Sequence, residues 1–312
     1  MPPSRTGFLG TPEPRRLRAL LGVLLGVALF AGYRVAKGRF GRKHVPPHVV
    51  TLEGESPVLP RVPRPARPAP THVSEGRLTL GGQIRRWVQV TPTVLVPGKR
   101  YPLVLVFHGD GGDASGFHEH YSFEEASGAD AILAYPEGLR STWDLETREG
   151  NRDVRFVEEL VAHLEARLPV DETRVFGTGY SSGGFLCNVI ACQKSGLFRA
   201  IASNAGGAPY NQAEKWPNGY PKCPGQKPIA MLALHGGMDF GVTLDSGRFS
   251  SEYWAYVNGC DLGEMESTGY AECHLYRGCP PEKRVGFCQI DTLGHWVWDR
   301  AADATWTFFQ RQ

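Results

Sequence analysis

A chain of 312 residues is long enough for one large domain or two small ones, and 41% hydrophobic residues with 21% charged ones can form a sizeable core. The formal net charge of +2 is unevenly distributed, because residues 1–43 hold nine Lys or Arg and one acidic residue. The remainder is mildly acidic and offers no basic surface, which excludes a nucleic-acid-binding protein.

The first candidate element is an apolar run at residues 19–33 (ALLGVLLGVALFAGY), which follows a basic segment at 1–18 containing Arg15, Arg16 and Arg18. The run is shorter than the ~20 residues that span a bilayer comfortably and is typical of a signal peptide. No clear cleavage site follows, and the basic residues after the run oppose its translocation. We therefore expect an extracytoplasmic protein, periplasmic or extracellular. Both a cleaved signal peptide and a signal-anchor that holds the chain to the membrane stay open.

Residues 34–75 are basic at first and then rich in proline. Proline at this density disfavours helices and sheet interiors and favours an extended polyproline-like chain. We interpret this stretch as a linker and predict one folded domain at 76–312.

Buried strands and helices alternate in the pattern of that domain. Residues 78–80 and 85–90 are typical of an opening hairpin, and unbroken apolar runs at 102–108 and 131–135 predict strands buried on both faces. Residues 154–168 have helical spacing, with Asp153 as the expected N-cap. Further strands are predicted at 174–178, 200–204, 229–235 and 284–290, and a last helix at 301–310. The alternation predicts an α/β fold with a mostly parallel sheet and helices on both faces.

The most specific motif is GYSSGG at residues 179–184, which holds Ser181 in a G-x-S-x-G pattern. Alone this pattern is weak, and a glycine-rich turn explains it equally well. Here a predicted strand precedes it and an apolar helix follows, which is the setting of a nucleophile elbow. Ser181 is therefore the predicted nucleophile.

A serine nucleophile needs a base and an acid that orients the base. Asp239 and His295 each follow a predicted strand, and the chain order Ser, Asp, His is the one expected of α/β-hydrolases. We predict Asp239 as the acid, with Asp245 as its alternative, and His295 as the base. A loop acid and a structural histidine are the non-catalytic interpretations.

The negative charge that develops on the substrate oxygen needs backbone donors. We predict the amides of Ser182 and Asp110 as this oxyanion hole, with Gly109 as the alternative to Asp110. The run His118-Glu119-His120 resembles metal ligands, but a solvated loop explains it better because no third ligand is indicated. No metal and no organic cofactor is expected.

All seven cysteines lie between Cys187 and Cys288. In an exported chain, the four cysteines of residues 260–288 predict two disulfides, whose pairing the sequence leaves open. A zinc site is the alternative, but the spacings are irregular and no C-x-x-C pair occurs. Since seven is odd, at least one thiol is expected to be free, and Cys187 on the apolar helix is the candidate for a buried one.

Together these motifs resemble the polyhydroxybutyrate depolymerase and feruloyl esterase group of α/β-hydrolases, near carbohydrate esterase family 1. The likeness covers nearly all of 76–312 and rests on LTLGG (78–82), PLVLVFHG (102–109), DVRFV (153–157), VFGTGYSSGG (175–184), HGGMD (235–239) and GHWVW (294–298). It implies an α/β-hydrolase fold without a large lid.

The chain departs from that family at Asp110, at Ser182 and at Trp296, which directly follows the histidine. These departures leave the substrate open, although residues 258–288 look more like the feruloyl and acetyl-xylan esterase branch. We predict that Trp143 and Trp298 line an aromatic acyl pocket, with Trp254 and Trp296 as further candidates and core packing as the alternative for each.

The sequence thus predicts a secreted or membrane-tethered serine esterase that forms an acyl-enzyme. Its expected substrates are feruloyl or acetyl esters of a polysaccharide, or polyhydroxyalkanoate-type polyesters. A serine peptidase on the same fold and a catalytically inactive, envelope-binding scaffold are the alternatives.

Overall fold

The computed structural model describes residues 46–50, 59–61 and 70–312. Residues 47–312 form one compact unit. The basic segment 1–18, the apolar segment 19–33 and most of the predicted linker lie outside the described residues. Within the part of the chain that the structure describes, no helix is both long and apolar enough to cross a bilayer.

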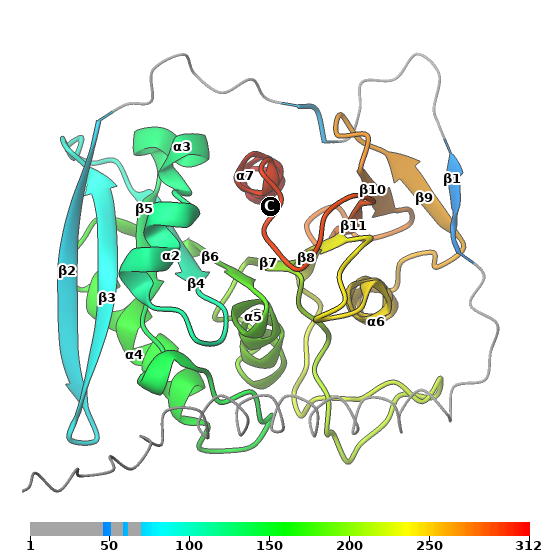
Figure 1. Cartoon of the computed structure of the whole chain (residues 1–312), viewed down its shortest axis with the longest axis horizontal. Helices are drawn as coiled ribbons and strands as arrows, with labels where there is room; N and C mark the ends of the chain where they lie inside the picture. The colour runs from blue at the N-terminus through cyan, green and yellow to red at the C-terminus, as the bar shows by residue number, and fades with distance from the viewer. Residues whose placement is uncertain (1–45, 51–58, 62–69) are drawn as a thin grey trace, which may run out of the picture. The chain divides into compact units, whose positions relative to one another are not determined.

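An eleven-stranded sheet in the order β1-β9-β10-β11-β8-β7-β6-β4-β5-β3-β2 forms the centre of this unit (Figure 1). The six strands from β11 to β5 in this order are parallel, and antiparallel pairs lie on either side of them. The strands are β1 (His48–Val50), β2 (Thr71–Leu80), β3 (Gln83–Pro92), β4 (Tyr101–Phe107), β5 (Ile132–Pro136), β6 (Val170–Tyr180), β7 (Ala200–Asn204), β8 (Ala230–Gly236), β9 (Glu264–Ser267), β10 (Cys273–Tyr276) and β11 (Val285–Ile290).

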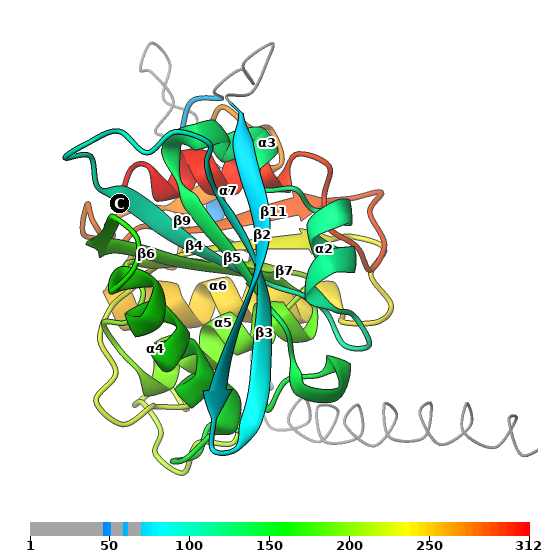
Figure 2. The same ribbon diagram turned by 90° about the vertical axis from the view of Figure 1, so that its left-hand side faces the viewer.

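Helices cover both faces of the sheet, as the alternation of elements predicts (Figures 1 and 2). One face packs against α4 (Arg152–Glu165), α5 (Ser182–Gln193) and α6 (Leu244–Asn258), and the other against α2 (Ala114–His120), α3 (Glu124–Ser127) and α7 (Ala301–Phe309). Strand β4 shows why its run is unbroken: Leu103 and Leu105 belong to the first core, and Val104 and Val106 to the second. A strand buried on both faces has no polar side to display.

Helix α4 begins differently from the sequence-based expectation. Its N-cap is Asn151, whose side chain accepts hydrogen bonds from the amides of Asp153 and Val154, and not Asp153 itself. Asp153 lies in the first turn, fully buried, and forms an ion pair with Arg85 of β3 at 2.7 Å. The carboxylate therefore joins two elements and does not cap its own helix.

The predicted boundary of the folded domain at residue 76 is too late. Strand β2 begins at Thr71, β1 pairs in parallel with β9, and the buried Leu59 accepts a backbone hydrogen bond from Gly269. Strands β1 and β2 lie at the two edges of the sheet and contain no proline themselves. The prolines between them gave this stretch the composition of a linker and hid both edge strands.

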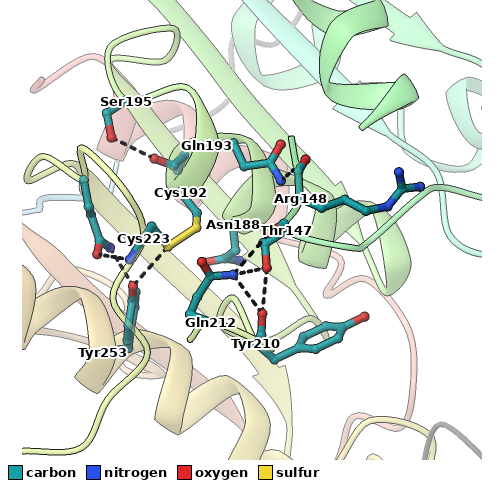
Figure 3. The surroundings of a disulfide bond; sticks show 12 residues. Thr147, Arg148, Asn188, Cys192, Gln193, Ser195, Tyr210, Gln212, Cys223 and Tyr253 are labelled. Atoms are coloured by element: carbon teal, nitrogen blue, oxygen red, sulfur yellow. Dashed lines mark hydrogen bonds between the residues drawn. A yellow bond between two sulfur atoms is a disulfide. The ribbon is translucent and has the colours of Figure 1, made fainter. Parts of the chain in front are cut away.

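Three disulfides connect the part of the chain that follows α5. Cys260–Cys279 and Cys273–Cys288 confirm the two bonds expected in residues 260–288, and Cys187 is free and buried as expected. The sequence did not predict the third bond, Cys192–Cys223, which joins the end of α5 to the long connection at 205–229 (Figure 3).

The same connection also contacts the segment that precedes α4. Gln212 hydrogen-bonds the Thr147 hydroxyl, which donates to the Tyr210 carbonyl at 2.7 Å (Figure 3). The long connection is therefore held at Cys223, Gln212 and Tyr210, beside α5, whose N-cap is Ser181.

Candidate active site

Ser181 lies at the sharp turn between β6 and α5, in the strand-turn-helix setting that the motif predicts. Its backbone has φ 52° and ψ −119°, a conformation that residues other than glycine rarely adopt. Its amide donates to the Asn204 carbonyl at 2.9 Å, and its carbonyl accepts from Phe185 at 3.0 Å. The strained residue is thus held by β7 on one side and by its own helix on the other.

Two glycines make this turn possible. A Cβ on Gly179 would lie 2.5 Å from the Gly183 backbone, and one on Gly183 would lie 2.3 Å from the carbonyl oxygen of Phe107. The strand, the helix and the end of β4 therefore approach one another more closely than any side chain allows.

The structure brings the three predicted catalytic residues together. Nε2 of His295 lies 2.9 Å from Oγ of Ser181, and its Nδ1 lies 2.8 Å from Oδ2 of Asp239. These distances are hydrogen bonds, so the three side chains form one continuous chain of contacts. Asp245, the alternative acid, lies in the first turn of α6.

Asp239 is buried and its carboxylate is surrounded by donors. Oδ1 accepts from the amides of Gly241 and Val242, each at 2.8 Å, while Oδ2 faces His295 and also His235 Nε2 at 3.3 Å. Burial raises the pKa of this carboxyl, but the hydrogen bonds from His235, His295 and Val242 outweigh it and hold the pKa below its usual value. Asp239 is therefore ionised over the working range of an esterase.

The loop after β4, which the sequence predicts as the oxyanion loop, lies against Ser181. A Cβ on Gly109 would lie 3.4 Å from Cβ of Ser181. The Gly111 amide donates to Ser141 and the Gly112 amide to Gly109. Among the described residues no acceptor is found for the amides of Gly109 and Asp110, the two that the sequence proposes as donors.

His108 and Trp143 fix the start of this loop. Nδ1 of the buried His108 donates to the Gly109 carbonyl at 2.7 Å, and its Nε2 accepts from the Gly138 amide at 2.9 Å. Burial lowers the pKa of His108, which keeps the ring neutral in this tautomer. The Trp143 indole donates to the His108 carbonyl at 2.8 Å.

Neither Trp143 nor Trp298 is open to a substrate, and Trp254 is fully buried as well. Trp143 is 5% exposed beneath the loop after β4, and Trp298 is 7% exposed in the core around α7, with its ring near Tyr270. The alternative of core packing therefore applies to both. The sequence pattern could not separate the two roles, because burial depends on the direction in which each loop turns.

Different apolar side chains are exposed beside the triad. Trp296 is 48% exposed and Phe240 is 85% exposed, each next in sequence to a triad residue, and Met238 on the other side of Asp239 is half exposed. The Trp296 ring lies 5.2 Å from the Tyr180 ring. Trp296 was already a candidate for the acyl pocket, whereas Phe240 and Met238 were not, although their position next to Asp239 in the sequence is a signal that could have pointed to them.

The structure also assigns contacts to the histidines considered as metal ligands. His118 Nε2 contacts Glu124 at 2.6 Å, and His120 Nδ1 contacts the Gly116 carbonyl at 2.7 Å. The first contact joins α2 to α3 and the second lies within α2, so both have a local structural role.

Known proteins are similar to this chain in sequence. Residues 141–216 match the Prolyl oligopeptidase family. The chain is 30% identical over 227 residues to the probable feruloyl esterase C of Aspergillus niger, covering 67% of this chain and 77% of that protein. It is 28% identical over 244 residues to the probable feruloyl esterase C of Aspergillus terreus, covering 72% of this chain and 83% of that protein.

Solved structures share the fold. An acetyl xylan esterase from Aspergillus awamori superposes with a TM-score of 0.58 at 19% identity, covering 76% of this chain and 99% of that one. A ferulic acid esterase superposes with a TM-score of 0.55 at 14% identity, covering 77% of this chain and 98% of that one. The chain therefore has the α/β-hydrolase fold, is a carboxylic ester hydrolase and belongs to the feruloyl esterase C family.

Proposed function

We propose that the protein is a serine esterase whose nucleophile is Ser181, with His295 as general base and Asp239 as the residue that orients it. The contact chain Ser181–His295–Asp239, with distances of 2.9 and 2.8 Å, is the single observation that carries the proposal. His295 takes the hydroxyl proton as Ser181 attacks the ester carbonyl, and then gives it to the leaving alcohol. Water, activated by the same histidine, releases the acid from the acyl-enzyme.

The oxyanion of the tetrahedral intermediate is proposed to bind the Ser182 amide and an amide of the loop after β4. Ser182 is the first residue of α5, so its amide has no partner within the helix and lies at the positive end of the helix dipole. Gly109 lies against Ser181, and the amides of Gly109 and of Asp110, the next residue, are the candidates for the second donor. Loss of one such donor typically lowers kcat by ~10²–10³.

The proposed substrates are feruloyl or acetyl esters attached to polysaccharide. The names of the relatives favour these esters, and Trp296 and Phe240 add exposed ring faces next to the triad that suit an aromatic acid or a sugar ring. Polyhydroxyalkanoate-type polyesters are the second substrate class, for which no comparison provides support beyond the fold.

A fluorophosphonate probe tests the nucleophile directly. We expect mass spectrometry to locate one adduct on Ser181, and Ser181→Ala to abolish both the adduct and hydrolysis. Methyl ferulate, acetylated xylan and polyhydroxybutyrate then rank the substrates by kcat/KM. An adduct on another serine, or full activity in Ser181→Ala, would overturn the mechanism.

The match to the Prolyl oligopeptidase family over residues 141–216 favours a serine peptidase as a second candidate, because the same triad cleaves amides. This match covers the nucleophile elbow but less than half of the chain. A peptide p-nitroanilide assayed beside methyl ferulate separates the two. Turnover of the anilide with a kcat/KM above that of every ester would favour the peptidase.

We propose that the catalytic domain works outside the cytoplasm. The three disulfides support this location, since such bonds persist in oxidising compartments, and the Arg-flanked apolar run at 19–33 supports export. Sequencing the N-terminus of the protein recovered from its host tests cleavage, and carbonate extraction of membranes tests anchoring by residues 19–33.

A further inference from the structure

The motif HGGMD contributes a second residue to the site besides Asp239. His235, the sixth residue of β8, is buried at the end of the strand. Its Nε2 lies 2.8 Å from the Val242 carbonyl oxygen and 3.3 Å from Oδ2 of Asp239. One ring nitrogen therefore faces both the carboxylate and the far end of the loop that presents it.

These contacts fix the tautomer of His235. A carbonyl oxygen can only accept, so Nε2 carries the proton and donates it. Among the described residues, Nδ1 has no hydrogen-bond partner, and it lies against Gly247 of α6. A Cβ on Gly247 would lie 2.3 Å from Nδ1, so only glycine leaves room for the ring in this place.

We propose that His235 is a positioning residue for the catalytic acid: its Nε2–H holds the carboxylate of Asp239 and the Val242 end of the loop in the geometry that His295 requires, and Gly247 provides the space for it. This inference rests on the proposed role of Asp239. It adds a second, buried histidine contact to the carboxylate of the triad, besides that of His295.

The hydrogen bonds to Asp239 explain how such a residue changes catalysis. Oδ1 is held by two backbone amides, whereas Oδ2 is shared between His295 and His235. When the His235 donor is removed, more negative charge is left for the His295 ring, and the protonated form of His295 becomes more favourable. Tyr180 is a further titratable group beside this pair, with its ring 5.1 Å from that of His295.

Three substitutions separate positioning from simple packing. In His235→Gln the amide nitrogen reaches the place of Nε2, in His235→Asn it reaches only the place of Nδ1, and His235→Leu has no donor. We measure kcat and KM for p-nitrophenyl acetate across pH, at a wavelength where the phenol and the phenolate absorb equally. The Leu and Asn variants are expected to have a kcat about tenfold below that of the wild type. In both, the acidic limb of the kcat/KM profile is expected to shift to higher pH by about half a unit or more. The Gln variant is expected to keep the kcat and the acidic limb of the wild type.

A second variant perturbs the His235 ring from α6, outside the loop that presents Asp239. Gly247→Ala places a methyl group against Nδ1 of His235, although alanine is by itself a better helix former than glycine. We expect a lower kcat and the same upward shift of the limb. Gly116→Ala in α2 is the matched control, since its Cβ would meet nothing closer than 3.5 Å, and its pH profile should equal that of the wild type.

The outcomes are distinct. If the Leu variant keeps the wild-type limb, or if it loses activity and Gln does not restore it, His235 is only a packing residue and the inference is wrong. Asp239→Asn is measured in parallel: if it remains fully active, the proposed role of Asp239 fails. If it is inactive and the His235 variants behave as wild type, only the present inference fails.

Discussion

The hydroxyl of Tyr180 donates a hydrogen bond of 2.7 Å to the backbone carbonyl of His295. This bond ties the residue before the nucleophile to the backbone of the base, over 115 positions of sequence. Burial, and then the nearby charge of Asp239, raise the pKa of Tyr180 to about 12, so the hydroxyl keeps its proton over any practical assay range.

Tyr180→Phe should therefore lower kcat/KM by about three- to tenfold, since a net hydrogen bond contributes ~0.5–1.5 kcal/mol. The rate falls because His295 is held less firmly, while all three triad side chains are still present. Steady-state kinetics with methyl ferulate provide the measurement. Tyr210→Phe, in the connection at 205–229, is the control and should leave kcat/KM unchanged. Equal kinetics for wild type and Tyr180→Phe would contradict the positioning role.

The lowered pKa of Asp239 predicts how stability depends on pH. A carboxyl whose pKa is lower in the folded than in the unfolded state stabilises the protein fully above its unfolded pKa of about 3.9, and this contribution is lost as pH falls through the folded pKa. The Tm difference between wild type and Asp239→Asn should thus be constant at neutral pH and shrink below about pH 4. Thermal unfolding by circular dichroism from pH 2.5 to 7 measures it. A difference that grows on acidification would show the opposite sign.

The exposed and buried tryptophans near the site should respond differently. Trp296→Ala is expected to raise KM for methyl ferulate severalfold, with a smaller effect on methyl acetate and no change in Tm, because the ring is half exposed. Trp143→Phe removes the donor to the His108 carbonyl and should lower kcat and Tm with both esters alike. Similar losses on both substrates in Trp296→Ala would rule out a substrate contact.

The buried ion pair between Arg85 and Asp153 makes a prediction about stability alone. Asp153→Asn or Arg85→Met leaves one buried partner uncompensated, which typically costs ~3–5 kcal/mol of unfolding free energy. The double variant Arg85→Met/Asp153→Asn should be less destabilised than the sum of the single ones. Urea unfolding of the four proteins measures the coupling. Additive effects would mean that the two side chains act independently.

The sequence predicted those parts of the fold that local patterns determine. Strand β4 and strand β7 have apolar runs that only a doubly covered strand needs, and Ala200–Asn204 was predicted with its exact limits. The three triad residues could be found for the same reason, since each follows such a strand and the fold places their ends at one edge of the sheet.

Other features depend on partners distant in sequence. Strands β9 and β10 have four residues each and are defined by their pairing and by the Cys273–Cys288 bond, not by their own pattern. The direction of Trp143 and the second contact of His235 to Asp239 depend on loops that fold back from other strands. Neither composition nor periodicity contains that information.

Both outer strands of the sheet come from residues before position 81. Strand β1 lies at one edge, next to β9, and β2 lies at the other, next to β3. A recombinant fragment that starts at residue 76 would lack β1 and half of β2, so open backbone groups would remain on β9 and β3, where other copies can pair. Such a fragment should elute as soluble aggregates in size-exclusion chromatography, whereas one that starts at residue 46 should elute as a defined species. This comparison tests whether the stretch that looks like a spacer protects the enzyme against self-association.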